Sequence, residues 1–429
     1  KPKAEEAKPA EAAPAAGPTV TGSVDLGYRF VTNGGNFDAY RSVVNLGEGP
    51  KVFGFDLSIT SPTSRFYDKI NLFGSGWGGD PNQTLRLDAA KQKLYDFRVD
   101  YRNIAYYNFL GSFANPAIDR NVFSTQQGFD LRRRTIDMVL RFRPGTWISP
   151  YLAYTRNWGE GRGVADYVTG SVNQYPVAST TYDKTDQFRG GVNLEFAKFH
   201  VTLEQGGTIY KDDQTLSNGK NISGARTTPS LDQTAFLTNL IQAERVRGSS
   251  IFERAIATWT PFSWVDFSGS FLYSQPKDDV LYTQAATGNF PDPRTFQVLT
   301  SQSMYAAANS NQPHSTGNIN LELRPIRRVR ILESWMTDRY HTSSSIALNN
   351  VSFLTTPVFA NPGGDRLFVN YSRQQVQANV EVFSWLTVRG GWRKVWGDAQ
   401  VRAPLENGVQ YQPGNLDQQV GLLGGQIRM

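Results

Sequence analysis

The sequence predicts an all-β fold, and more narrowly a transmembrane antiparallel up-and-down β-barrel of about sixteen strands. Three observations predict it: polar and apolar residues alternate along many segments, these segments are long, and short turns alternate with long polar connections. Successive side chains of a strand point to opposite faces, so each alternating segment has one apolar and one polar face. No segment of comparable length keeps the 3.6-residue spacing of an amphipathic helix.

Alternation is clear in the first expected strand, GSVDLGYRF, where Val24, Leu26, Tyr28 and Phe30 share one face. The segments KLYDFRVDYRN, GVNLEFAKFHVTLE and VQANVEV divide in the same way. These runs last about 9–13 residues, more than the ~5–6 of a globular strand and close to the ~9–11 of a tilted membrane strand. The expected strands are 22–31, 50–60, 65–74, 83–90, 93–104, 131–143, 147–157, 186–196, 199–210, 250–260, 264–274, 316–324, 329–340, 371–382, 386–397 and 418–428.

Short connections join these strands in pairs, as in RFRPGTWISPYLAY and LELRPIRRVRIL, and segments rich in Asn, Ser, Thr, Gly, Gln and Asp separate the pairs. Short periplasmic turns and long extracellular loops are typical of an outer-membrane barrel. Residues 38–49 are assigned to the first loop or to the extension of a strand, because a separate strand there would put a long loop on the periplasmic side. The even strand count places both termini in the periplasm. The expected extracellular loops are 105–130, 158–185, 211–249, 275–315, 341–370 and 398–417.

The N-terminal residues 1–20 differ from the rest of the chain. They are rich in Ala, Pro, Lys and Glu, lack aromatic residues and an apolar run, and predict a disordered periplasmic tether. Residues 21–429 are expected to form a single barrel domain. The final GGQIRM resembles the first strand of a hairpin such as LELRPIRR, so the strand count would rise if the barrel continues beyond it.

The composition argues against several kinds of function. The 429 residues include no cysteine, which removes disulfides, thiolate metal sites, cysteine nucleophiles and covalently attached haem. No stretch approaches the ~20 apolar residues of a membrane helix. The net charge of +6 is spread along the chain, so no nucleic-acid partner is expected. We expect no intrinsic cofactor.

Charges on the polar face favour a membrane barrel over a soluble sandwich or propeller, which are the alternative folds for an alternating chain. So many charges would be costly in a dry core, whereas a wet lumen accommodates them and pairs opposite signs across strands. Trp and Tyr residues near strand ends are typical of interfacial girdles. The expected lumen-lining residues are Asp25, Arg29, Asp56, Asp96, Arg98, Asp100, Arg102, Asp137, Arg141, Arg143, Glu195, Glu204, Asp266, Glu322, Arg324, Glu381, Arg389 and Arg393.

The residue clusters that could carry chemistry are few. His200 shares the polar face with Glu204, but no G-x-S-x-G motif accompanies it, so no enzyme is expected. Asp212–Asp213 and Asp278–Asp279 could bind Ca²⁺ or bridge lipopolysaccharide, although their spacing fits no calcium loop and solvated carboxylates are the simpler interpretation. The run Arg132–Arg134 could attract anions or surface phosphates, or form a solvated rim. We expect neither a catalytic nor a metal site.

Several segments carry a family resemblance. GSVDLGYRF, YRSVVNLGEG and FDLSITSP, with the hairpins built as strand–Arg-Pro–strand, resemble the decahaem-associated outer-membrane barrels of the MtrB/PioB type, mainly over residues 22–104. The resemblance implies a non-enzymatic barrel around a multihaem cytochrome, for extracellular electron transfer. The chain departs from that family because it lacks the N-terminal CxxC of some members. Its expected strand count is also lower than such a sheath requires.

Two functions follow as hypotheses. The first is a passive pore for ions or small polar solutes, since about sixteen strands leave an aqueous channel and mixed charges tune a weak ion preference. The alternative is the sheath, whose haem would belong entirely to a periplasmic multihaem cytochrome. Both hypotheses place the chain in the bacterial outer membrane, in contact with its lipid and lipopolysaccharide.

Overall fold

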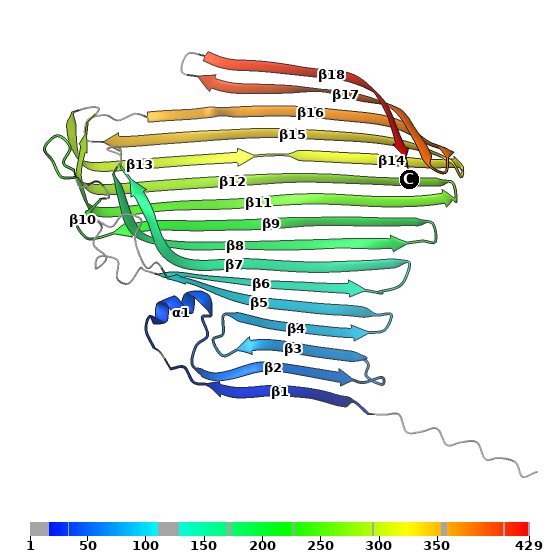
Figure 1. Ribbon diagram of the computed structural model, residues 1–429, viewed down its shortest axis with the longest axis horizontal. Coiled ribbons are helices and arrows are strands. Elements are labelled where there is room, and N and C mark those ends of the chain that lie inside the picture. The colour runs from blue at the N-terminus through cyan, green and yellow to red at the C-terminus, as the bar shows by residue number, and fades with distance from the viewer. Residues whose placement is uncertain are drawn as a thin grey trace, which may run out of the picture.

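The computed structural model describes residues 17–32, 34–109, 128–169, 173–224, 226, 228–293, 296–352, 358–405 and 408–427. Within these residues the chain forms one continuous antiparallel sheet and one short helix, which confirms the all-β prediction (Figure 1). No helix in the described residues is long and apolar enough to cross a membrane. The elements are β1 (Thr19–Arg29), α1 (Phe37–Val43), β2 (Gly49–Thr60), β3 (Lys69–Trp77), β4 (Asn82–Lys91), β5 (Tyr95–Phe109), β6 (Gly128–Phe142), β7 (Ile148–Val168), β8 (Gln174–Glu195), β9 (Phe199–Asn218), β10 (Ile222–Ser223), β11 (Phe236–Phe262), β12 (Val265–Asp292), β13 (Gln297–Asn311), β14 (His314–Ile326), β15 (Val329–Ser352), β16 (Val358–Phe383), β17 (Leu386–Leu405) and β18 (Gly408–Ile427).

The eighteen strands of the sheet amount to sixteen full-length ones. β10 has only two residues, and β13 and β14 are halves of one strand, because both pair antiparallel with β12 and with β15. The break between these halves falls at Pro313, which has no N–H to donate to a ladder. Each of the sixteen strands expected from alternation overlaps one full-length strand.

The connections alternate between the two edges of the sheet (Figure 1). One edge, which we call the turn edge, carries the β2–β3, β4–β5, β6–β7, β8–β9, β11–β12, β14–β15 and β16–β17 connections, and the opposite, far edge carries the others between full-length strands. β1 starts at the turn edge, where Thr19 is opposite Thr60, and β18 ends there, where Ile427 is opposite Leu386. The parity expected from the sequence is therefore observed. β1 pairs only with β2 and β18 only with β17, so the described strands form an open sheet with these two at its opposite ends (Figure 1).

The predicted long extracellular loops are wrong for most of their length. The segment 275–315, for example, is a hairpin in which β12 continues to Asp292 and β13 begins at Gln297. The same holds where β7 and β8, β9 and β11, β15 and β16, and β17 and β18 extend into the other segments. Of 105–130, the part 110–127 lies outside the described residues. These extensions carry polar residues on both faces, so alternation cannot reveal them, whereas the backbone ladder forms regardless of side-chain polarity.

Two further boundaries can be compared with the sequence. Residues 38–49 form no strand of their own: they contain α1 and the connection to β2, and the Asn36 side chain caps α1 by accepting the N–H of Ala39 at 3.1 Å. Residues 1–16 of the expected tether lie outside the described residues. β1 begins at Thr19, so the sheet starts slightly earlier than residue 21.

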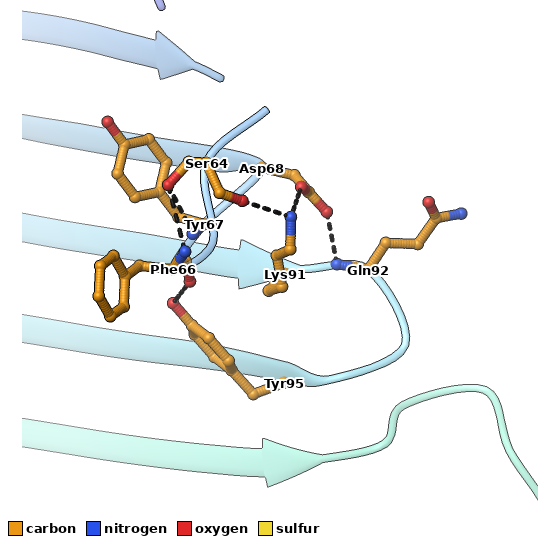
Figure 2. Close-up of polar contacts among 7 residues, drawn as sticks. All are labelled: Ser64, Phe66, Tyr67, Asp68, Lys91, Gln92 and Tyr95. Atoms are coloured by element: carbon orange, nitrogen blue, oxygen red, sulfur yellow. Dashed lines mark hydrogen bonds and ion pairs between the residues drawn. The ribbon is translucent and has the colours of Figure 1, made fainter. Parts of the chain in front are cut away.

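Polar contacts fix neighbouring turns at the turn edge (Figure 2). Lys91 Nζ donates to Asp68 Oδ1 at 2.5 Å and to the Ser64 carbonyl at 2.7 Å, and the Gln92 N–H donates to Asp68 Oδ2 at 2.6 Å. The Tyr95 hydroxyl donates to the carbonyl of residue 66 at 2.7 Å. The hydrogen bond from Lys91, followed by the one from the Gln92 N–H, lowers the pKa of the Asp68 carboxyl. The β2–β3 turn is thereby tied to the β4–β5 turn.

The two faces of the sheet differ in polarity, as the alternation predicts. Aromatic pairs mark the turn edge: the ring centroids of Trp147 and Phe196 lie 5.8 Å apart, and those of Phe383 and Trp385 lie 5.4 Å apart. Further out, on the apolar face, large apolar side chains such as Phe188, 53% exposed, have no protein cover. We call the opposite side, which carries Glu204 and Asp266, the polar face.

Candidate channel lining

One cluster of ion pairs on the polar face spans β4 and β5. Arg98 Nε lies 2.7 Å from Asp88 Oδ1, and Arg86 Nε lies 2.9 Å from Asp88 Oδ2. Arg86 also lies 3.8 Å from Asp100. These groups come from alternate residues of neighbouring strands, so their side chains share one face. Two predicted residues, Arg98 and Asp100, are thus joined through Asp88 and Arg86, neither of which was predicted although both alternate in LRLDAA.

A second cluster centres on Glu204 of β9. Arg254 of β11 lies 3.0 Å from Glu204 Oε1, and the Tyr151 hydroxyl of β7 donates to Oε2 of the same carboxylate. Tyr151 reaches Glu204 by crossing β8 at Gly191, where an added Cβ would lie 2.7 Å from the tyrosine ring. The Glu204 side chain is only 4% exposed. Its burial and its two partners give this carboxylate a fixed position on the polar face.

A third cluster lies on the polar face near the turn edge of β12, β14 and β15. Arg324 is hydrogen bonded to Asp266, and both Arg324 and Arg330 lie 3.9 Å from Glu322. The cluster borders a recess of about 520 Å³, which Gln375 and other polar side chains also line. The mixed charges of these clusters can attract ions of either sign, because opposite charges alternate across neighbouring strands.

The structure brings some of the predicted lining residues together and separates others. Arg141 pairs with Asp96 at 3.3 Å, and Glu195 is hydrogen bonded to His200 beside the β8–β9 turn. Arg143 is a correction: it lies in the β6–β7 turn with a φ of 47°, where its carbonyl accepts a hydrogen bond from Thr146, and not on a strand. The expected strand 131–143 is therefore one residue too long, because the alternating pattern continues beyond the end of β6.

The remaining predicted residues occupy individual positions along the strands. Asp137 lies 3.7 Å from Arg189, and Arg393 donates to Gln375 at 2.9 Å. Arg102 and Arg389 have no ion-pair partner among the described residues. The three remaining residues lie on strands directly opposite uncharged residues. Asp25 is opposite Gly54, Asp56 is opposite Ser23, and Glu381 is opposite Thr387. Whether these residues line a channel stays a prediction.

Arg29 belongs to a compact ion cluster at the far edge that the sequence did not reveal. Asp80, in the β3–β4 turn, is bonded to both Arg29 and Lys51, with Lys51 Nζ at 3.2 Å. Lys51 also donates to the Gly78 carbonyl at 2.6 Å, and its side chain is 1% exposed. Burial raises the pKa of the Asp80 carboxyl, but the hydrogen bonds and charges of its two cationic partners outweigh burial and lower it overall.

An apolar cluster covers part of the polar face at the far edge, and we call it the outer cap. Its buried members are Tyr167, Tyr175, Val177, Ile222, Leu237, Leu240, Ala286 and Phe290. The ends of β7 and β8 bend over the sheet to reach β12 and β13 (Figure 1). The Tyr167 hydroxyl accepts from Gln284 at 3.0 Å and donates to Gln302 at 3.3 Å.

The path of this bend follows from the strand order. Four strand spacings of about 4.8 Å separate β7 from β12 within the sheet, or about 19 Å, so contact between them requires the hairpin to fold across the intervening strands. Leu240 and Gln284 belong to the face that carries Arg254, because their strands pair in constant register from one to the other. The outer cap therefore lies over the polar face. Desolvation in this cap raises the pKa values of Tyr167 and Tyr175.

Other candidate sites are dispersed by the structure. Consecutive residues of a strand point to opposite faces, so the carboxylates of Asp212–Asp213 and of Asp278–Asp279 do not converge. Among the described residues, no group of three or more His, Asp or Glu side chains is placed to hold a metal ion. Of the run Arg132–Arg134, Arg133 pairs with Asp183 at 2.7 Å, while Arg132 and Arg134 lie on the opposite face.

Comparison with known proteins gives only weak similarities. No protein family and no curated protein matches the sequence. Among solved structures, the siderophore receptor PiuA from Acinetobacter baumannii matches over 84% of this chain and 69% of its own, with 8% identity and a TM-score of 0.38. The unliganded ferric citrate transporter FecA matches over 97% and 79%, with 8% identity and a TM-score of 0.33, and the RagAB peptide transporter over 84% and 52%, with 7% identity and a TM-score of 0.31. At these scores we draw nothing about the present protein from its likeness to them.

Proposed function

We propose that this chain forms the wall of an outer-membrane β-barrel whose polar face lines an aqueous channel for ions or small polar solutes. The observation that carries the proposal is the division of one continuous sheet into two unlike faces. One face is apolar and framed by aromatic rings, whereas the other carries buried or paired charges, such as Glu204 and Asp266, within the same strand spans. A soluble protein would have to cover the apolar face, and a bilayer does so directly.

The height of the apolar face supports the membrane proposal. Trp147 in the β6–β7 turn and Trp158 on β7 bracket the apolar residues of that strand, eleven positions apart. At ~3.3 Å per residue and a strand tilt of ~40°, this interval spans about 28 Å. The apolar band of an outer-membrane barrel is ~25 Å tall. Trp158 is in turn part of an aromatic group, with its ring centroid 6.4 Å from that of Tyr101.

A bilayer imposes one further requirement on this sheet. Exposed strand edges cannot remain unpaired in hydrocarbon, so β1 and β18 must find partners, either each other or additional strands. Their directions permit mutual pairing, since β1 runs away from the turn edge and β18 runs toward it. In a closed barrel the outer cap would lie across part of the outer mouth and narrow the channel.

Planar-bilayer recording tests the channel, and cysteine cross-linking tests the closure. Because the chain has no cysteine, Val24→Cys on β1 can be combined singly with Gly421→Cys, Leu423→Cys or Gly425→Cys on β18 without background reactions. A pore of sixteen strands should give steady ion conductance and a disulfide within one chain for at least one register. Absence of conductance from membrane-inserted protein would contradict the pore proposal.

The second candidate is the sheath around a multihaem cytochrome, and one observation favours it. β1 and β18 lie at opposite ends of the sheet and are not paired with each other (Figure 1). A barrel in which they stay apart needs additional strands to close, so its lumen would be wider than that of sixteen strands. This arrangement would give no β1–β18 disulfide within one chain. Haem absorbance that copurifies with the protein, together with poor conductance of the protein alone, would favour the sheath over the pore.

A further inference from the structure

The apolar face changes character along one continuous row of residues. In register across β6, β7, β8, β9 and β11, directly opposed residues are Arg134, Trp158, Lys184, Lys211 and Arg247. Directly opposed residues of antiparallel strands point to the same side. Trp158 fixes that side as the apolar face, because its ring contacts Tyr101. Four of five consecutive positions on this otherwise apolar face are therefore cationic.

The rows directly beyond and below this one extend the cationic surface, which we call the cationic belt. Over β6 to β12 the three rows hold eight basic and four acidic side chains. The basic residues are Arg132, Arg134, Arg156, Lys184, Lys211, Arg245, Arg247 and Lys277, and the acidic ones are Glu160, Asp186, Asp213 and Asp279. The belt has an excess of positive charge because its acids are too few to pair with every cation.

Several cations of the belt are neutralised within the protein. Lys184 Nζ lies 2.6 Å from Asp186, and Arg247 lies 2.6 Å from Asp213. Arg134 also pairs, at 3.1 Å, with Glu160.

Three other cations are left over. Arg132, Lys211 and Arg245 are exposed and have no ion-pair partner among the described residues. Lys211 is moreover directly opposite Lys184 on one side and Arg247 on the other. Like charges placed directly opposite each other destabilise a sheet, so the fold gains nothing from this arrangement. An external anion would offset the repulsion.

The depth of the belt identifies where such an anion would be found. On β11, Trp259 at the turn edge and Arg247 in the belt are twelve residues apart, which spans about 30 Å at the same rise and tilt. The guanidinium of Arg156 lies 5.1 Å from the centre of the Trp158 ring, and that of Arg134 lies 5.9 Å from it. Aromatic rings of this kind lie at the level of the headgroups, so the belt is at the outer surface of the hydrocarbon layer.

We propose that the cationic belt binds the phosphate groups of a phosphorylated glycolipid in the outer leaflet, with Arg132, Lys211 and Arg245 as the residues that supply the unpaired charge. Arg and Lys are the side chains that recognise phosphate, Arg through its planar fork and Lys as a point charge. The inference rests on the proposed membrane embedding. It adds to it a defined lipid site on one side of the barrel, over β6 to β12.

The test compares two variants that lose the same charge. The belt variant carries Arg132→Gln, Lys211→Gln and Arg245→Gln, which removes no ion pair of the described structure. The control carries Arg65→Gln, Arg327→Gln and Arg328→Gln, three exposed cations at the turn edge. Delipidated protein in detergent is titrated with bis-phosphorylated lipid A, with dephosphorylated lipid A and with inorganic phosphate, and bound lipid is measured by native mass spectrometry.

We expect the wild-type protein and the control to bind phosphorylated lipid A with equal affinity, and to bind the dephosphorylated form and free phosphate much more weakly. The belt variant should bind phosphorylated lipid A about 100-fold more weakly, because each cation near an anionic surface contributes ~1 kcal/mol. Wild-type binding should also weaken as salt is raised. Equal binding of the two lipid forms by wild-type protein, or an unchanged affinity of the belt variant, would overturn the inference. Either result with normal conductance would leave the channel proposal standing, whereas a chain that needs no detergent would overturn both.

Discussion

Leu240→Ala tests whether the outer cap restricts the channel that we propose. The Leu240 side chain is completely buried in the cap, whereas that of its neighbour Ile241 is 62% exposed on the opposite face of β11. Truncation of a fully buried leucine costs about 2–5 kcal/mol, because apolar contacts are lost and a cavity remains. Truncation of an exposed side chain usually changes stability by less than ~0.5 kcal/mol. Ile241→Ala is thus a matched control in the next position of the same strand.

The loss of stability caused by Leu240→Ala should affect the outer cap more than the sheet beneath it. The outer cap joins the bent ends of β7 and β8 to β11, β12 and β13 through side-chain contacts, while the strands below it keep their backbone ladders. A destabilisation of 2–5 kcal/mol confined to the cap would raise the ratio of open to closed forms by roughly 30- to 5,000-fold. An open cap exposes more of the polar face at the outer mouth.

Single-channel recording and hydrogen exchange give the two readouts of this prediction. Leu240→Ala should increase the conductance or the open probability, and should speed amide exchange at Tyr175 and Val177, while Ile241→Ala should resemble the wild type in both measurements. Faster exchange in Leu240→Ala with unchanged conductance would refute the idea that the cap restricts the channel. Unchanged exchange would refute the assignment of Leu240 to the core of the cap.

Three further substitutions test the polar groups. Asp80→Asn should lower the free energy of unfolding by about 3 kcal/mol, measured by urea denaturation, because it leaves buried Lys51 without a counterion. The pKa of Asp80 is lowered in the folded protein, so in the wild type its contribution to stability is present above the normal carboxyl pKa. That contribution is lost as the pH falls through the lowered pKa. Glu204→Gln should shift the reversal potential in a KCl gradient toward anion preference, because Arg254 then keeps its charge unopposed, and an unchanged potential would exclude Glu204 from the ion path. Asp68→Ala should speed exchange of the amide of residue 92, because that N–H loses its acceptor. Acidification through the lowered pKa of Asp68 should do the same in the wild type after correction for intrinsic exchange, and an amide that exchanges at an unchanged rate in the variant would contradict this role of Asp68.

The sequence predicts the strands well because their alternation has a physical cause. Residues such as Phe97 and Val99 must face an apolar medium while Asp96 and Arg98 face a polar one, so the pattern survives in one dimension. Contacts between side chains on different strands cannot be predicted in this way. The contact of Tyr151 with Glu204 depends on the register of three strands and on the absence of a side chain at residue 191, and none of these follows from spacing.

The sequence pattern could not predict the outer cap, for a related reason. Tyr175 and Val177 have the same spacing as any strand pair, yet they are buried because their hairpin folds back across other strands. Tyr167 meets Gln302 at a sequence separation of 135 residues. Such a contact is set by where the hairpin bends and not by local periodicity.

The errors in strand length bear on the proposed membrane embedding. Alternation ended the expected strands at residues 157 on β7, 210 on β9 and 250 on β11, although these strands extend well beyond those points. All three positions lie within three residues of the row that contains Trp158, Lys211 and Arg247. Alternation requires two different media on the two faces, so it should end where the apolar medium ends. In the membrane embedding that we propose, the point at which the sequence pattern fails and the point at which the cationic belt begins have one common cause, the outer surface of the hydrocarbon layer.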